Sequence, residues 1–248
     1  MSAADPIDLL FGGLEKLGPG SDEETLQMLH RVPRERLDVV VDAGCGAGRQ
    51  TMVLVEALRK TVHAVDSHEP FLQTLRRRAA QANVGHLVQV HCMDMQGIAS
   101  RFPAIDLLWS EGAAYNIGFA NALASWSTAI RPGGFAVVSE LAWLTKDAPP
   151  SAREFFAAAY PGMQPSTENV AIAGRVGYDV LGTHTLSRQA WTEGYYDVLE
   201  PRARALAGHA DDAVRQFARE ILTEIDVFNA SHGSYGYVFY LLRARGRP

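Results

Sequence analysis

Residues 37–48 read LDVVVDAGCGAG, and this stretch decides the fold. It begins with β-branched apolar residues, which is the composition of a strand buried on both faces. An acid, Asp42, follows the strand, and three glycines come after it at alternate positions: Gly44, Gly46 and Gly48. Glycine permits positive φ angles and lets a ligand approach the backbone. Because the next ten residues carry apolar side chains at helical spacing, the stretch predicts a strand, a tight turn and a helix.

This order of elements is how a parallel sheet holds a nucleotide-like ligand at the carboxyl ends of its strands. The glycines follow the pattern G-x-G-x-G, and Arg49 stands where the later glycine of a dinucleotide fingerprint, G-x-G-x-x-G, would be. The spacing therefore disfavours a nicotinamide dehydrogenase. The plain alternative is a glycine-rich turn that binds no ligand.

Composition limits the other function classes. The chain has 248 residues, of which 47% are apolar and 21% charged, which suits one α/β domain with insertions. A net charge of -5 argues against a domain that binds nucleic acid through its phosphates. Two cysteines make no disulfide framework, no apolar run is long enough for a membrane helix, and the start lacks a signal pattern. We therefore expect a cytoplasmic protein that does not bind membranes.

The segment before the first strand predicts a helix that begins after Ser21, because Glu24 completes a capping box. The GPGS sequence at 18–21 is interpreted either as a linker or as part of a lid over the site. A second strand over 61–65 ends at Asp66, about 20 residues after the glycine turn, where a carboxylate takes ribose hydroxyls. The alternative for Asp66 is a helix N-cap.

Three further apolar runs predict strands at 87–90, 105–109 and 135–139, and polar or sulfur-containing residues follow each of them. These residues are Met93 and Asp94, Ser110 and Glu111, and Glu140. The RPGG sequence at 131–134 predicts the end of a helix over 119–130. The carboxyl ends of parallel strands meet at one edge, so we expect these residues to share a site.

The acid and glycine pattern resembles the first motif of class I S-adenosylmethionine (SAM) methyltransferases, and the RPGG turn before a fifth strand is similar to theirs. The sequences GPGSDEET, DAGCGAG, WSEGAAYNIGF and GYVFYLLR, in this order, resemble a group of small, mostly uncharacterised bacterial methyltransferases. The resemblance covers nearly the whole chain. It implies SAM as cofactor and S-adenosyl-L-homocysteine as product, and it does not indicate which molecule accepts the methyl group.

The implied fold is α/β, a three-layer Rossmann-like methyltransferase fold. Its seven-stranded, mostly parallel sheet has an antiparallel seventh strand inserted between the fifth and sixth. We assign 1–248 to a single domain with three parts: an N-terminal helical lid (1–36), a cofactor-binding core (37–147) and substrate-side insertions with the last two strands (148–248). The sixth strand is expected over 178–186, a helical insertion over 191–231, and the seventh strand over 235–243.

The resemblance also implies roles for cofactor-binding residues. The glycine turn would contact the methionine part, Asp42 would help order its ammonium group, and Asp66 would bind the ribose. The remaining expected contacts are Ser67 beside Asp66, Met93 and Asp94 at the adenine, and Ser110 near the methyl group. The adenine-binding acid of the commonest pattern lies two positions before Asp94, where this chain has Cys92.

The predicted reaction moves the sulfonium methyl to a small-molecule acceptor by in-line displacement, and no metal is expected. Glu111 and Glu140 are candidate bases, or groups that bind a polar part of the acceptor; two carboxylates suggest a cationic acceptor such as an amine. The expected acceptor pocket contains Tyr115, Asn116, Trp191 and Tyr195, although the last two equally fit packing of the insertion. The alternative function is a SAM-binding sensor or partner protein without transfer, and a homodimer is possible.

Overall fold

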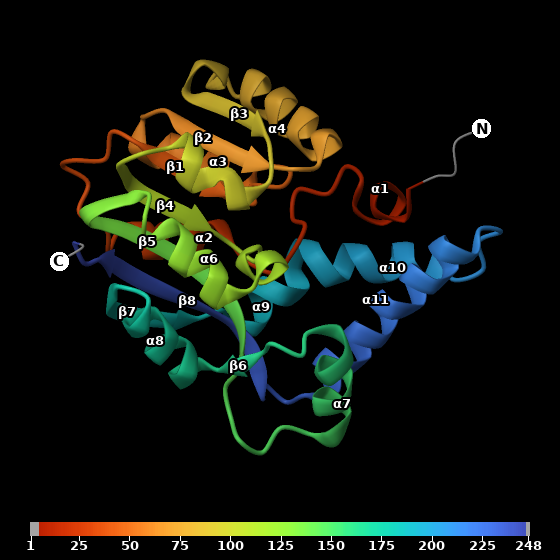
Figure 1. The fold of residues 1–248 in the computed structure, drawn as a ribbon. Helices are drawn as coiled ribbons and strands as arrows, with labels where there is room; N and C mark the ends of the chain where they lie inside the picture. Colours follow the sequence, from red (N-terminus) through yellow and green to blue (C-terminus); the bar gives the residue numbers. More distant parts are fainter. Residues whose placement is uncertain (1–4, 247–248) are drawn as a thin grey trace.

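The computed structural model describes residues 5–246, and its centre is an eight-stranded sheet (Figure 1). Seven strands follow the order β3-β2-β1-β4-β5-β8-β7, and the short β6 pairs with β5 beside this path. The strands are β1 (Val40–Ala43), β2 (Val62–Asp66), β3 (Val88–Cys92), β4 (Ile105–Ser110), β5 (Ile130–Trp143), β6 (Gln164–Pro165), β7 (Tyr178–Thr185) and β8 (Tyr235–Ala244). The two-residue β6 is the one strand that the sequence does not predict.

The direction of the last strand confirms the predicted fold class. Neighbouring strands from β3 to β5 are parallel, whereas β8 runs antiparallel to both β5 and β7 and lies between them. The order reverses at β1, since β2 lies on one side of it and β4 on the other. In open α/β sheets, ligands bind outside the carboxyl ends of the strands at such a switch point.

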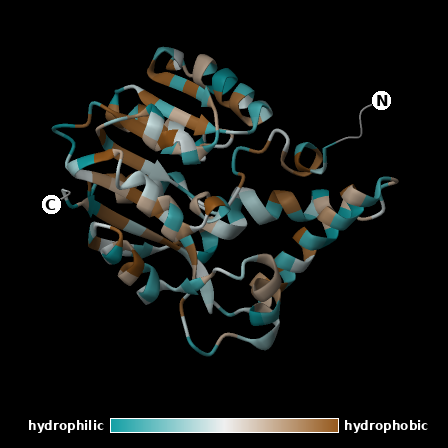
Figure 2. Cartoon of the chain, viewed as in Figure 1, coloured by the Kyte–Doolittle hydropathy of each residue, from teal (hydrophilic) through white to brown (hydrophobic). Residues whose placement is uncertain are grey.

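Both faces of the sheet are covered by helices. One face packs against α2 (Asp22–Leu29), α3 (Arg49–Leu58) and α4 (Glu69–Gln81), and the other against α5 (Ile98–Arg101), α6 (Phe119–Trp126) and α8 (Ser166–Arg175). Figure 2 shows hydrophobic residues concentrated along the strands between these layers. Side chains alternate along β5, so Val137 faces the first layer and Val138 the second.

The remaining helices form a unit beyond the carboxyl ends of the strands (Figure 1). They are α1 (Pro6–Phe11), α7 (Pro150–Ala159), α9 (Arg188–Trp191), the π-helical turn η4 (Thr192–Tyr196), α10 (Asp197–Leu206) and α11 (Asp212–Ala230). α1 packs against α10 and α11, and Arg202 donates hydrogen bonds to the carbonyls of Leu10 and Gly12 at 3.1 and 2.8 Å. The N-terminal helix and the helical insertion before β8 therefore build one cap. Within residues 5–246, none of the helices is both long and apolar enough to cross a membrane.

The capping-box prediction is confirmed, whereas the expected helix end near the RPGG turn is wrong. The Ser21 hydroxyl accepts a hydrogen bond from the Glu24 amide at 3.1 Å, where α2 begins. The helix over 119–130 ends at Trp126 instead, and the RPGG residues lie inside β5. Ile130 already pairs with Ile105, and the ladder shifts register before it continues. The glycines thus accommodate an irregular strand start.

Asp106, near the start of β4, binds the backbone directly before β1. Its carboxylate accepts hydrogen bonds from the amides of Asp38 and Val39 at 2.8 and 2.7 Å and pairs with Arg131. Partial burial acts to raise the pKa of Asp106, but the hydrogen bonds from Val39, Arg131 and Asp38 outweigh it and lower the pKa. The contacts support the structural role that its position at the strand start suggests.

We therefore expect Asp106→Asn to lower the free energy of unfolding by about 2 kcal/mol, since charge-assisted hydrogen bonds are lost. Urea denaturation at neutral pH measures the change. Asp179→Asn is the matched control: Asp179 pairs with Arg243 at 2.9 Å on the surface, where such pairs contribute little. An equal effect of the two substitutions would contradict the role given to Asp106.

Candidate functional site

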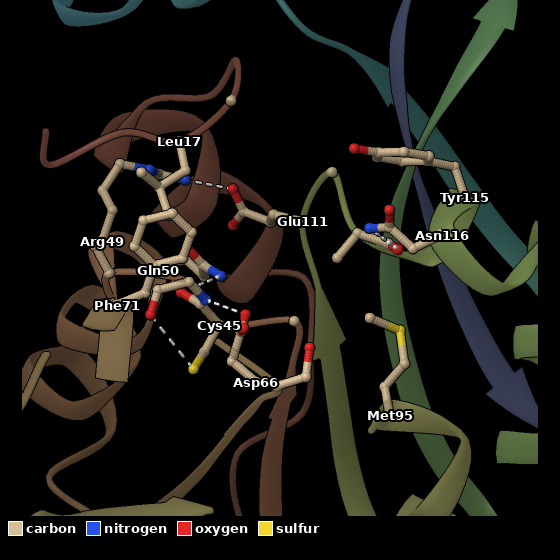
Figure 3. Close-up of a pocket in the computed structure, with 18 of the residues that line it drawn as sticks. Leu17, Cys45, Arg49, Gln50, Asp66, Phe71, Met95, Glu111, Tyr115 and Asn116 are labelled. Carbon is tan, nitrogen blue, oxygen red and sulfur yellow. Dashed lines mark hydrogen bonds and ion pairs between the residues drawn. The ribbon is translucent and has the colours of Figure 1, made fainter. Parts of the chain in front are cut away.

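A cavity of about 490 Å³ opens at the carboxyl ends of β1, β2 and β4 (Figure 3). The residues of the glycine turn form its floor, and residues from three other places complete the lining. These are the loops after β2 and β3 with the start of α4 (Asp66, Ser67, Phe71, Met93, Asp94, Met95, Gln96), the segment after β4 (Glu111, Gly112, Ala113, Tyr115, Asn116, Ile117) and the N-terminal segment (Ile7, Glu15, Leu17, Gly18, Pro19). Many of the residues singled out in the sequence therefore come together at the topological switch point.

The glycine turn has a conformation and a packing that only glycine allows. Gly44, Gly46 and Gly48 have φ angles of 73°, 55° and 84°. A Cβ atom on Gly44 would stand 2.2 Å from the Cβ of Ala113, and one on Gly48 would stand 2.2 Å from Leu75 Cδ1. The glycines therefore bring the turn against its neighbours and keep its backbone accessible to a ligand.

Asp66 orients this turn from the neighbouring strand. One carboxylate oxygen accepts from the Gly46 amide and the other from the His68 amide, each at 2.9 Å. The N-cap of α4 is His68, so the alternative prediction of Asp66 as the cap is wrong. A carboxylate has about four acceptor positions, and two remain for a ligand in the cavity that Asp66 lines.

Asp42 lies beneath the cavity rather than in its wall. It is fully buried and accepts hydrogen bonds from the Thr51 hydroxyl at 2.5 Å and the Gln50 amide at 3.2 Å. Burial raises the pKa of Asp42 to about 7, against the effect of these two donors. Gln50 does line the cavity, so Asp42 acts on the site by fixing that side chain. Ser110 is also fully buried and lies outside the lining.

The expected adenine-binding residues all line the cavity. Asp94 caps the short turn η2 (Met95–Gly97) by accepting from the Gln96 amide at 2.8 Å, and the Met93 amide donates to the Asp66 carbonyl at 2.9 Å. Ser67 lies beside them. Met95 and Gln96 join the wall although the sequence does not single them out, because only the capped turn brings them back to the cavity.

Glu111 is the most heavily bonded group of the site. One oxygen accepts from Trp109 Nε1 and from the Thr25 hydroxyl, both at 2.7 Å, and the other pairs with Arg49. Arg49 also pairs with Asp22 at 2.8 Å (Figure 3 shows the contact with Glu111). The network ties α2, α3 and β4 together. This arrangement suits a structural carboxylate better than a base that must receive a proton.

Glu140 has the opposite surroundings. It lies within the buried part of β5 and outside the cavity lining, it is 1% exposed, and within residues 5–246 neither carboxyl oxygen has a hydrogen-bond partner. Burial raises the pKa of Glu140 to about 8, although the nearby Tyr160 hydroxyl and Leu141 amide act to lower it. A carboxyl group with a pKa near neutrality and no committed partner has the properties of an acid–base group.

The predicted acceptor residues divide into two groups. Tyr115 and Asn116, in the short helix η3 (Ala114–Ile117), line the cavity opposite Arg49 (Figure 3), and Tyr115 is 40% exposed. Trp191 is buried outside this lining and stacks on Phe228 with ring centroids 4.9 Å apart. The packing interpretation therefore fits Trp191. Tyr195 is buried as well and stacks on its neighbour Tyr196 at 5.0 Å.

The N-terminal segment covers the site, which supports the lid interpretation of the GPGS sequence. Lys16 Nζ donates to the carbonyls of Ala190 and Glu193 at 3.0 and 2.6 Å, and the Gly20 amide donates to Ala190 at 3.1 Å. Burial and the nearby Arg49 charge lower the pKa of Lys16 to about 8. These contacts hold residues 17–19 over the glycine turn, against the C-terminal insertion.

Comparison with known proteins agrees with this geometry. Residues 40–134 match a family model described as a methyltransferase domain. The fold is that of a class I methyltransferase. No protein of curated function matches the chain in sequence. The narrower resemblance to one bacterial group stays a prediction.

Solved structures extend the likeness to the whole chain. A SAM-dependent methyltransferase from Thiobacillus denitrificans has 19% identity and a TM-score of 0.80, over 99% of this chain and 100% of its own. One from Geobacter sulfurreducens has 20% identity and a TM-score of 0.80, over 98% and 99%. The [4+2]-cyclase SpnF has 16% identity and a TM-score of 0.76, over 98% and 92%. Both methyltransferases contain S-adenosyl-L-homocysteine, in agreement with the cofactor predicted from the sequence.

The surroundings of Glu140 predict a pH-dependent stability. Because the folded state holds the Glu140 proton up to about pH 8 and the unfolded chain releases it near pH 4.5, stability falls as the pH rises through this range. Between about pH 5 and pH 8.5 we expect the wild type to lose on the order of 3 kcal/mol more than Glu140→Gln. Denaturant unfolding at both pH values measures the difference.

The pKa of Asp42 lies in the same pH range in the wild type and in Glu140→Gln. The difference between these two proteins therefore reports the contribution of Glu140 alone. The control is Glu154→Gln, at an exposed position of α7, which should follow the wild type. Equal pH dependence in the wild type and Glu140→Gln would contradict the burial of an unpaired carboxyl group.

Proposed function

We propose that this protein is a SAM-dependent methyltransferase that acts on a small molecule. The observation that carries the proposal is the cavity at the switch point, where the glycine turn and the Asp66 carboxylate face the same space. Its volume of about 490 Å³ lies in the range of small-molecule sites. Polypeptide or nucleic-acid acceptors would need a broader or more basic surface than this acidic chain offers.

The lining fits the cofactor part by part. The turn backbone at Gly44 and Gly46 would hold the methionine part, with Gln50 beside it, and the free acceptor positions of Asp66 would bind the ribose hydroxyls. Met93 offers a polarizable face to the adenine, and Asp94 carries the nearby carboxylate. When bound, SAM supplies a methyl group that its sulfonium has already activated.

The chain contributes to the reaction by orienting the acceptor and by excluding water from the cavity. In-line displacement requires the acceptor atom, the methyl carbon and the sulfur to be collinear, so much of the rate comes from orienting the acceptor. Leu17 and Pro19 cover the cavity on one side and Tyr115 stands on the other. Where the acceptor carries a proton, a Glu140 carboxylate oxygen is the proposed receiver, in preference to Glu111, whose oxygens already accept from Trp109, Thr25 and Arg49.

The second candidate is a SAM-binding protein that does not transfer the methyl group. The similar fold of a [4+2]-cyclase keeps this candidate in view, because one fold hosts different activities. Incubation with methyl-labelled SAM and a metabolite extract separates the two. Label in a new small molecule supports the methyltransferase, and binding of SAM without transfer supports the sensor. The homodimer and the cytoplasmic location stay predictions.

Asp66→Ala tests the cofactor site. It should weaken binding of S-adenosyl-L-homocysteine by roughly 1–3 kcal/mol, because ribose hydroxyls lose their acceptor. Isothermal titration calorimetry measures the affinity, and an unfolding curve checks the turn, since Gly46 also loses its hydrogen bond. Asp38→Ala, at an exposed position before β1, is the control and should leave binding unchanged. Unaltered affinity in a folded Asp66→Ala protein would remove Asp66 from the site.

Paired substitutions test the choice between the two glutamates. Glu140→Gln should reduce label transfer by roughly 10²–10⁴-fold while the affinity for SAM stays near that of the wild type, as expected for a base. Glu111→Gln should weaken SAM binding instead, because it releases Arg49 and loosens α2 over the cavity. Wild-type transfer by Glu140→Gln would exclude Glu140 as the base.

A further inference from the structure

The segment that covers the cavity is bound at both of its ends to the same atom. Lys16 Nζ and the Gly20 amide both donate to the carbonyl oxygen of Ala190, at 3.0 and 3.1 Å. The three residues between these ends, 17–19, line the cavity, whereas Lys16 itself lies outside the lining. We call residues 16–20 the strap.

The carbonyls that receive Lys16 become accessible where the helical insertion breaks. Between α9 and α10, Glu193 has an extended ψ of 120° and Gly194 a left-handed φ of 67°. A helix end leaves carbonyl oxygens without amide partners, and a cation is a favourable partner for them. Lys16 Nζ also donates to the Glu193 carbonyl at 2.6 Å, and a Cβ on Gly194 would stand 3.5 Å from Lys16 Cδ. The break therefore provides both the acceptors and the room for the lysine stem.

The Ala190 carbonyl is a fixed point for the strap. Ser187 caps α9 by accepting a hydrogen bond from the Ala190 amide at 3.2 Å. The Ser187 amide in turn donates at 2.8 Å to the carboxylate of Glu24, in α2, the helix that follows the strap. Ala190 is buried. The strap is therefore bound to an element that is itself held to the N-terminal segment.

The middle of the strap has few attachments of its own. Among residues 5–246, the amides of Leu17 and Gly18 donate to none of the backbone carbonyls. A Cβ on Gly18 would meet no atom within 4 Å. Leu17 Cδ1 lies 2.7 Å from the position that a Cβ on Gly46 would take, so the strap reaches down to the glycine turn. Release of Lys16 would leave residues 16–19 held to the cavity chiefly by this leucine contact.

We propose that Lys16 is a positioning residue that holds the strap over the cavity as a gate, and that cofactor and product enter and leave when Lys16 releases the carbonyls of Ala190 and Glu193. The inference rests on the proposed methyltransferase function. A lysine suits this task, because its three donors sit on a flexible stem and can exchange the two carbonyls for water without unfolding a helix. Opening of such a loop sets the rate of product release in many enzymes.

Lys16→Met tests the gate, because methionine keeps an unbranched apolar stem and removes the donors. Stopped-flow mixing with S-adenosyl-L-homocysteine gives the association and dissociation rate constants. A released strap eases entry as well as exit, so we expect both constants to rise roughly fivefold or more, while the affinity changes by less than about threefold. Loss of a direct contact with the ligand would raise the dissociation rate constant alone.

Lys146→Met, at an exposed position after β5, is the matched control and should keep the rate constants of the wild type. Unfolding curves verify that both variants are folded. Rate constants unchanged in Lys16→Met, or a rise in dissociation without a rise in association, would overturn the gate.

Amine labelling of the wild type tests the strap without a substitution. The chain has three lysines: Lys16, Lys60 and Lys146. An acetylating reagent, followed by peptide mass spectrometry, should modify Lys16 on the order of tenfold more slowly than Lys146, since burial against α9 restricts access. Saturation with S-adenosyl-L-homocysteine should slow Lys16 further, because the ligand contacts residues 17–19, and should leave Lys60 and Lys146 unchanged.

Equal labelling of Lys16 and Lys146, or labelling of Lys16 that the bound ligand does not slow, would contradict the proposal. If S-adenosyl-L-homocysteine does not bind at all, the proposed function fails, and labelling of the free protein then tests the strap alone. Slow labelling of Lys16 there supports the pinned strap, and labelling as fast as that of Lys146 overturns it.

Discussion

The close packing of the glycine turn against its neighbours is the constraint on which the site depends. Gly44 touches Ala113 after β4, and Gly48 touches Leu75 of α4, at distances that no larger residue permits. The turn is thereby fixed relative to both neighbouring strands. Asp66 adds a hydrogen bond to the Gly46 amide, so the same carboxylate that would bind a ribose also holds the surface beneath it. Preorganisation of this kind lowers the cost of binding.

A second constraint connects the turn to the lid. Arg49 stands where a dinucleotide fingerprint has glycine, and it pairs with Glu111 after β4 and Asp22 in α2. The side chains of Arg49 and Glu111 are 9% and 4% exposed. Loss of Arg49 would therefore leave a buried carboxylate without a cation. The departure from the dinucleotide pattern therefore supplies a contact between the glycine turn and α2, the helix that follows the lid residues.

The sequence predicts the fold well wherever a signal is local. Apolar runs locate the long strands, the glycine spacing indicates the turn, and Ser21 with Glu24 marks the start of α2. The direction of β8 follows from the family resemblance and is confirmed. Signals that depend on distant partners are missed. The start of β5 at Ile130 is set by its pairing with Ile105, and β6 exists only because Gln164 pairs with Ala142.

The same distinction applies to the site. Positions after the strand ends bring Asp66, Asp94 and Tyr115 to the cavity. These positions do not reveal that Glu111 is engaged by Arg49, since this depends on how segments far apart in the chain pack. Our central claim is that the cavity binds a sulfonium nucleoside and its product. Calorimetric titration of the purified protein with S-adenosyl-L-homocysteine tests it most directly: we predict saturable one-to-one binding in the micromolar range. Absence of that binding, together with uptake of NADH, would contradict the account.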